Sequence, residues 1–332
     1  MDNKLTRRDA LRLMGGLGAL GVALPALSAC SGAAPSAGAD GYKIGVLQLT
    51  EHAALDAAHK GFFKALDASG IAYQVDDNNA QNDQSACQTI ATKLVNAGED
   101  LILAIATPAA QAVAGATTDI PIIGTAITDF AASGLVASNE KPGNNVTGSS
   151  DLTPVAEQFD LLAKLFPAAR TVGVLYCTAE SNSDVQVKLA DEAAASHGLA
   201  VTHFSVSSSN EIQQVVESMV GKVDVAYAPT DNTIAAGMTT VAMVANDNGL
   251  PVIVGDVGMV ENGGLATYGI NYEELGKLAG QMAVKVLKGE SKPADMPIQH
   301  LDVSKCALVS NKKVAEKLDV DLSVLGDSQT QV

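Results

Sequence analysis

Arginine and aromatic side chains are scarce in this chain. It contains no tryptophan, and all aromatic residues together make up 4% of the sequence. Beyond the first dozen residues the only arginine is Arg170, which precedes a predicted strand. Because phosphates and dicarboxylates are normally held by arginine or lysine, the shortage argues against strongly anionic ligands. Sugars also fit weakly, since binding sites for small molecules rely heavily on aromatic faces.

Positive charge is scarce overall. The formal net charge is −16, and removal of the first 29 residues would take away Lys4, Arg7, Arg8 and Arg12 but only two acidic residues. Nucleic acids and anionic membrane surfaces are bound by basic faces. The composition therefore excludes nucleic acid as a partner.

Motifs for catalysis and for metal binding are missing from the sequence. It has no CxxC, HExxH or GxSxG pattern, and no glycine-rich phosphate loop between a strand and a helix. We therefore expect no catalytic residues, no metal and no cofactor.

Four cysteines occur, at 30, 87, 177 and 306. If Cys30 is modified, three remain and one disulfide at most can form; a bridge between Cys177 and Cys306 is left open.

The N-terminus has the pattern of a bacterial export signal. A basic flank with Arg7-Arg8 precedes the apolar run Leu13–Leu27, and small residues follow. The paired arginines resemble the twin-arginine export motif, and Leu27-Ser28-Ala29-Cys30 resembles a lipobox, in which the cysteine receives lipid. The alternative is a transmembrane anchor, for which the run is short. We expect an exported protein anchored to the outer face of the cell membrane through lipid on Cys30, periplasmic if the cell has an outer membrane.

Apolar runs and helical patterns alternate along the rest of the chain. Runs typical of buried strands lie at 44–49 and 101–106, and helical periodicity covers 53–68. This alternation predicts an α/β fold in which a parallel sheet carries helices on both faces.

The same rhythm recurs in the second half of the chain. The segment 43–47 (KIGVL) is echoed by 171–175 (TVGVL), and 120–124 (IPIIG) by 250–255 (LPVIVG). Recurrence in the same order favours two lobes of similar topology; the alternative is that all strand–helix units look alike. We predict two doubly wound parallel-sheet lobes with a ligand cleft between them, at the carboxyl ends of the strands. The expected segments are a signal over 1–29, a tether over 30–41, a first lobe of 42–147 plus about 266–300, and a second lobe of 148–265 plus about 301–326.

Polar side chains that follow the predicted strands are the candidate ligand-binding residues. They are Glu51, His52, Thr107, Thr128, Asp129, Ser181, Asn182, Asp231, Asn232 and Asp256. Carboxylates can accept an ammonium group, and helix starts can hold a carboxylate, so this set favours a zwitterion. Simpler interpretations remain for several members: Thr107 and Ser181 as helix caps, Asp129 and Asp231 as turn residues, and Glu51 beside His52 as a solvated first-turn pair.

Several motifs, taken in order, resemble one family. They are QLTEHAALD at 48–56, AIATPAAQ at 104–111, ESNS at 180–183 and PTDNT at 229–233. The chain resembles the substrate-binding lipoproteins of ABC transporters, in the tryptophan/tyrosine-type branch. The resemblance implies a type I periplasmic-binding-protein fold, an aromatic amino acid as ligand and a membrane permease as partner. Carried onto this sequence, it implies ligand-binding roles for Glu51, Thr107, Ser181, Asn182, Asp231 and Asn232.

The sequence therefore predicts a lipid-anchored solute receptor of an ABC importer that closes on its ligand by a hinge motion. Three alternatives stay open: the same fold binding a branched amino acid, peptide or nucleoside; a sensory receptor; and, least supported by the motifs, an exported enzyme.

Overall fold

The computed structural model describes residues 41–332. The expected signal sequence, the lipidation site at Cys30 and nearly all of the expected tether lie outside the described residues. The described residues belong to a single compact unit. Within the described part of the chain, no helix combines the length and the apolar character needed to cross a membrane.

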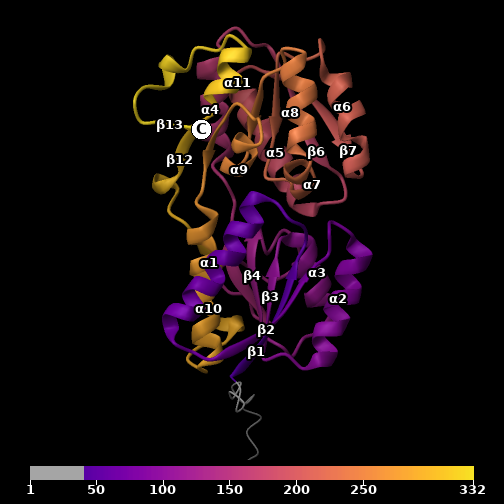
Figure 1. Ribbon diagram of the computed structural model, residues 1–332, viewed down its shortest axis with the longest axis vertical. Coiled ribbons are helices and arrows are strands. Elements are labelled where there is room, and N and C mark those ends of the chain that lie inside the picture. The colour runs from indigo at the N-terminus through magenta and orange to yellow at the C-terminus, as the bar shows by residue number, and fades with distance from the viewer. Residues whose placement is uncertain (1–40) are drawn as a thin grey trace, which may run out of the picture. The chain divides into compact units, whose positions relative to one another are not determined.

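The first lobe is built on a six-stranded sheet with the order β11-β5-β4-β3-β1-β2, in which all pairs are parallel. Its strands are β1 (Tyr42–Gln48), β2 (Tyr73–Asn79), β3 (Leu101–Ile105), β4 (Ile122–Ile127), β5 (Val146–Ser150) and β11 (Gln299–His300). Helices α1 (Ala53–Ser69) and α10 (Tyr272–Leu287) pack side by side on one face, and α2 (Gln84–Ala97) and α3 (Thr107–Ala116) pack together against the other (Figure 1).

The second lobe is built on a seven-stranded sheet with the order β13-β12-β10-β9-β8-β6-β7. Its strands are β6 (Thr171–Cys177), β7 (Ala200–Val206), β8 (Val225–Ala228), β9 (Val252–Val254), β10 (Ala266–Gly269), β12 (Ala307–Ser310) and β13 (Thr330–Gln331). Only the β10–β12 pair is antiparallel. Its helices are α4 (Val155–Leu165), α5 (Ser181–Ser196), α6 (Ile212–Met219), α7 (Asn232–Ala236), α8 (Met238–Asp247), α9 (Val257–Glu261) and α11 (Lys312–Lys317), with short 3₁₀ turns at Ser209–Glu211 and Leu322–Leu325. A 3₁₀ turn at Pro293–Asp295 belongs to the first lobe, and another at Val303–Lys305 lies where the chain crosses between the lobes.

The predicted repeat is confirmed by the order of the strands. In the first sheet the strands run 2-1-3-4-5, and in the second sheet β7-β6-β8-β9-β10 repeat that order. Side chains of β6 alternate between two apolar clusters, with Val174 facing α4 and α5 and Leu175 facing α6 and α8. Both faces of the sheet are therefore covered, as a parallel sheet requires. The predicted α/β class with two doubly wound lobes is confirmed.

Strand pairing gives lobe boundaries that differ by a few residues from the expected ones. Strand β5 pairs with β4 along its length, so the first lobe extends past 147 to Ser150. Strand β10 pairs with β9 and β12 in the second sheet, so the chain returns to the first lobe after Gly269 rather than at 266. Strand β13 carries the second lobe beyond 326 to Gln331. The chain thus crosses between the lobes near 151–154, 270–271 and 301–306.

Helices α1 and α10 approach closely because glycines lie at their crossing. A Cβ on Gly276 would lie 1.9 Å from the carbonyl oxygen of Ala58, and one on Gly61 would lie 2.0 Å from that of Glu273. Both neighbours are backbone atoms, which no side-chain rotation can move away. The contact fastens a helix that follows β10 of the second lobe onto the first lobe.

We expect Gly276→Ala to lower the free energy of unfolding by roughly 3 kcal/mol, because the methyl group would force the two helices apart. The matched control is Gly115→Ala, at an exposed position of α3 where an added Cβ meets nothing within 4 Å. That change should raise stability by about 0.5–1 kcal/mol. Urea unfolding of both variants measures the difference, and equal stabilities would contradict the close-packing argument.

Candidate functional site

A polar pocket, here called the interlobe pocket, lies between the two lobes and is nearly filled by its own side chains, with a cavity volume of about 10 Å³. Its first-lobe lining comes from the start of α1, the ends of β4 and β5 and the start of α10. Its second-lobe lining comes from the segments that follow β6, β8 and β9. The lining residues are His52, Leu55, Ala126, Thr128, Asp151, Asn182, Thr230, Asp231, Asn232, Ala235, Asp256 and Tyr272. All of them except His52 are buried.

The lining is rich in acceptors and poor in positive charge. It contains three buried carboxyl groups, from Asp151, Asp231 and Asp256, and neither lysine nor arginine. Burying carboxylates without a cation is unfavourable, so each needs hydrogen-bond donors or a positively charged partner.

Asp151 has one oxygen in use and one without a partner. The hydroxyl of Tyr272 donates to Oδ2 at 2.8 Å, whereas Oδ1 is buried and accepts no hydrogen bond. Burial raises the pKa of Asp151 to about 6, with the negative charge of Asp256 contributing in the same direction. Asp151 lines the interlobe pocket, so the wall of this pocket contains a buried carboxyl oxygen without a hydrogen-bond partner.

Asp231 is held by the second lobe itself. Its Oδ2 accepts hydrogen bonds from the backbone N–H of Cys177 at 2.7 Å and from the hydroxyl of Ser183 at 2.6 Å, and Oδ1 caps α7 through the N–H of Ile234 at 2.9 Å. Burial, and then the nearby charge of Glu180, raise the pKa of Asp231 well above its usual value. Asp231 is therefore a helix cap that also faces the interlobe pocket.

Asp256 caps the short helix α9, accepting from the N–H of Met259 at 3.0 Å. Burial raises its pKa, and the nearby His52 acts in the opposite direction.

The Nδ2 group of Asn182 donates a hydrogen bond to Glu180 at 3.2 Å, and the Oδ1 of Asn182 is buried without a partner. Two unpartnered acceptors, on Asp151 and Asn182, thus belong to the same pocket.

The structure brings six of the ten predicted site residues to this pocket. They are His52, Thr128, Asn182, Asp231, Asn232 and Asp256. The other four lie elsewhere. Thr107 is buried at the start of α3, Ser181 accepts a hydrogen bond from Gln111 at 3.2 Å, and Asp129 caps a turn through the N–H groups of Ala131 and Ala132, both at 3.0 Å.

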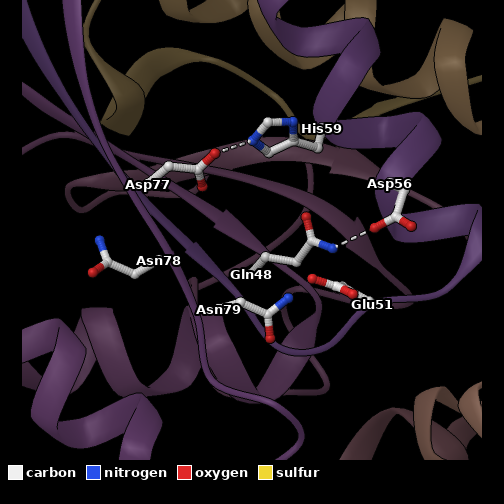
Figure 2. Close-up of a pocket in the computed structure, with 7 residues that line it drawn as sticks. All are labelled: Gln48, Glu51, Asp56, His59, Asp77, Asn78 and Asn79. Atoms are coloured by element: carbon white, nitrogen blue, oxygen red, sulfur yellow. Dashed lines mark hydrogen bonds and ion pairs between the residues drawn. The ribbon is translucent and has the colours of Figure 1, made fainter.

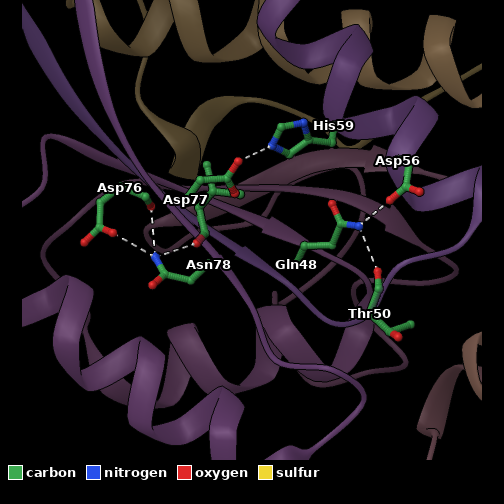
Figure 3. A network of polar contacts seen from close by, with 8 residues as sticks. Gln48, Thr50, Asp56, His59, Asp76, Asp77 and Asn78 are labelled. Carbon is green, nitrogen blue, oxygen red and sulfur yellow. Dashed lines mark hydrogen bonds and ion pairs between the residues drawn. The ribbon is translucent and has the colours of Figure 1, made fainter.

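Glu51 is exposed and lines a second polar pocket, of about 400 Å³, formed by the first lobe alone (Figure 2). There Gln48 donates to the carboxylate of Asp56 at 2.7 Å and to the carbonyl oxygen of Thr50 at 2.8 Å, and His59 contacts Asp77 at 3.0 Å (Figure 3). Gln48, Asp56, His59 and Asp77 therefore find their hydrogen-bond partners within the first lobe. Among residues 41–332 no cluster of three or more histidine, cysteine or acidic side chains has the arrangement of a metal site.

Asp151, Thr230 and Tyr272 also line the interlobe pocket but are not among the ten site residues predicted from the sequence. Asp151 follows β5, so the rule that sites lie at strand ends would have found it if β5 had been recognised as a strand of the first sheet. The disulfide left open between Cys177 and Cys306 is absent, because Cys87, Cys177 and Cys306 are free thiols.

The chain is similar to characterised binding proteins. A tyrosine-binding protein of Clostridioides difficile (strain R20291) is 44% identical over 281 residues, which make up 83% of this chain and 81% of that protein. A structure from Streptococcus pneumoniae in complex with L-Trp is 41% identical, covers 88% of this chain and 100% of its own, and superimposes with a TM-score of 0.84.

A ligand-free, open substrate-binding protein from Clostridium difficile is 44% identical and also covers 88% of this chain and 99% of its own, yet its TM-score is 0.67. At similar identity and equal coverage, this chain superimposes more closely on the tryptophan complex than on the ligand-free, open protein.

Residues 43–325 match the family described as ABC transporter substrate binding protein. The match covers nearly all of the described chain and agrees with the two-lobed fold and the pocket between the lobes. This chain therefore belongs to the ABC transporter substrate-binding proteins and acts as the solute-binding component of such a transporter.

Proposed function

We propose that this protein binds an aromatic amino acid, tyrosine or tryptophan, outside the cytoplasm and delivers it to an ABC permease. The observation that carries the proposal is the pair of buried acceptors without partners, Asp151 Oδ1 and Asn182 Oδ1, in a pocket whose lining has no lysine or arginine. Such a pocket suits a ligand that donates hydrogen bonds and carries positive charge. The relatives named for tyrosine and L-Trp support the ligand class.

The α-ammonium group is assigned to Asp151. An ammonium beside Oδ1 would supply both the missing hydrogen bond and the compensating charge for a carboxylate that burial disfavours. Asp231 is a weaker candidate for direct contact, because both of its oxygens already accept hydrogen bonds from the second lobe.

The ligand carboxylate is assigned to the first turn of α1. No side chain caps the start of this 17-residue helix, and His52 and Leu55 at that start line the interlobe pocket. The free N–H groups of a helix start and the helix dipole both favour an anion there. This arrangement binds a carboxylate without an arginine, in agreement with the composition of the lining.

The aromatic ring is assigned to the apolar part of the pocket. Leu55, Ala126, Ala235 and Tyr272 contribute the carbon surfaces of the lining, and an aromatic side chain gains most from such contacts. Asn182 Oδ1 would then accept a hydrogen bond from the tyrosine hydroxyl or from the indole N–H, a donor that the phenylalanine side chain lacks.

Closure of the two lobes around the ligand is the proposed mechanism. A ligand that contacts both lobes favours the closed state by its differential affinity for that state, and the closed form would then dock on the permease. We further propose, from the N-terminal pattern alone, that lipid on Cys30 keeps the receptor at the membrane. The relatives are solute-binding proteins, so binding rather than turnover is the activity proposed here.

The proposed ligand class is tested by a thermal-shift screen of the chain from Ala34 onward against the twenty amino acids, sugars and nucleosides. Tyrosine or tryptophan at one hundred times its dissociation constant should add about 2.7 kcal/mol to the stability of the folded state. A flat response to both, with a shift produced by another class of solute, would contradict the ligand while leaving the family membership intact.

We expect Asp151→Asn to weaken binding of the amino acid by at least tenfold, because the amide keeps the shape of the side chain but loses the charge that pairs with the ammonium. Glu51→Gln is the matched control, since Glu51 is exposed and lies in the other pocket. Isothermal titration calorimetry on both variants decides the assignment, and an unchanged affinity for Asp151→Asn would remove this residue from ammonium binding.

Binding should also depend on pH. Asp151 titrates near pH 6 in the ligand-free protein, where Asp256, Tyr272 and Thr128 surround it, so affinity should fall by up to about tenfold per pH unit below that value. The free energy of unfolding of the ligand-free protein should change in the opposite direction, so that it is higher at low pH than at high pH. The folded state holds this proton more tightly than the unfolded chain does, so the stability contributed by Asp151 is full below about pH 4 and is lost as the pH rises through about 6.

Calorimetric titrations from pH 5 to pH 8, compared with chemical unfolding over the same range, measure both trends. Affinity that is flat across this range would show that the ligand does not pair with a carboxylate that titrates there.

A further inference from the structure

Apart from a long hydrogen bond from Gln186 to Thr128 at 3.5 Å, the side-chain hydrogen bonds that first-lobe residues donate to the second lobe converge on a small part of that lobe. Four side chains of the first lobe reach it, from the start of α1, from the start of α2 with its preceding turn, and from α3. The four contacts are Asn82 Nδ2 to Thr233 Oγ1 at 2.9 Å, Gln84 Nε2 to the Ala179 carbonyl at 2.8 Å, Gln111 Nε2 to Ser181 Oγ at 3.2 Å, and His52 Nε2 to Asn232 Oδ1 at 3.2 Å. We call this set the interlobe latch.

Glu180 lies at the centre of the four acceptors. It is 2% exposed, and its carboxylate accepts five hydrogen bonds from the second lobe. Oε1 accepts from the N–H and the hydroxyl of Thr233, both at 2.8 Å, and Oε2 accepts from Asn182 Nδ2 at 3.2 Å and from Asn232 N and Nδ2 at 3.1 and 2.6 Å. One carboxylate therefore ties the loop after β6 to the loop after β8.

The contacts of Glu180 also fix which atoms face the first lobe. Because Thr233 donates its only hydroxyl proton to Glu180, its oxygen is left to accept from Asn82. Because Asn232 directs its NH₂ group at Glu180, its amide oxygen faces His52, whose Nε2 must then carry a proton. The remaining two acceptors belong to Ala179 and Ser181, the residues on either side of Glu180.

We infer that Glu180 is the positioning residue of the interlobe latch, that it acts without contact with the solute, and that the latch stabilises the closed state. Glu180 does not line the interlobe pocket, and none of the four latch donors except His52 does. Since apparent affinity scales with the population of the binding-competent state, loss of the latch would weaken binding by lowering that population. The inference depends on closure of the lobes and is independent of which solute is bound.

The latch is tested first from the first lobe, where folding is not at risk. Gln84→Ala removes one donor at an exposed position, and Gln88→Ala, one turn further along α2 and also exposed, is the matched control. With L-tyrosine and L-tryptophan as probes, Gln84→Ala should speed dissociation about fivefold in stopped-flow fluorescence, whereas Gln88→Ala should match the wild type. In X-ray scattering of the ligand-free proteins, the radius of gyration should be larger for Gln84→Ala than for Gln88→Ala.

The organising role is tested by combining Gln84→Ala with Glu180→Gln. If Glu180 positions the acceptors, Glu180→Gln alone should open the ligand-free protein, and adding Gln84→Ala should change its scattering little further. Additive effects of the two changes would overturn the role of Glu180. Identical scattering and dissociation for Gln84→Ala and Gln88→Ala would overturn the latch itself.

Two further outcomes are decisive. Should Glu180→Gln lower the melting temperature while leaving the scattering of the ligand-free protein unchanged, Glu180 would be a structural residue of the second lobe only, and the inference would fail. Should neither amino acid bind the wild type, the proposed ligand would fail, and the scattering comparison of the ligand-free variants would still decide the latch.

Discussion

The burial of carboxyl groups in the interlobe pocket and directly beside it, without a cation in the lining, is the constraint on which the site depends. Glu180, Asp231 and Asp256 meet it with donors from their own lobe, chiefly the backbone N–H groups and side chains at the starts of α7 and α9. Asp151 meets it only in part, since Tyr272 serves one oxygen and leaves the other without a partner. The difference separates acids that hold the architecture together from one that is available to a ligand.

The two-lobed architecture places these acids where both lobes can use them. Parallel strands end at a common edge, so the residues that follow β4, β5, β8 and β9 meet although they are far apart in the sequence. The chain passes between the lobes three times, which keeps the lobes together while leaving their facing edges free to carry polar groups. The lining of the interlobe pocket therefore comes from both halves of the chain.

Much of this organisation could be predicted from the sequence. The alternation of apolar runs with helical periodicity, and its recurrence at KIGVL and TVGVL, led to two lobes of equal strand order. Strand β5 is harder to predict from the sequence. Its residues, VTGSS, are mostly small or polar, although every one of them is buried. Without an apolar run to mark it, the lobe boundary was placed too early and Asp151 was missed. The hydrogen bond that occupies one oxygen of Asp151 comes from Tyr272, 121 positions later in the chain, and no local pattern encodes such a contact.

The return of the chain to the first lobe has a consequence for how the protein acquires its structure. Helix α10 covers one face of the first sheet, and its glycines meet α1, more than two hundred residues earlier in the sequence. During synthesis, the face of α1 that carries Phe62 stays without its partner until the whole second sheet up to β10 has been made. The N-terminal lobe, although translated first, is completed late, and such long-range closure slows folding and exposes apolar surface in the meantime.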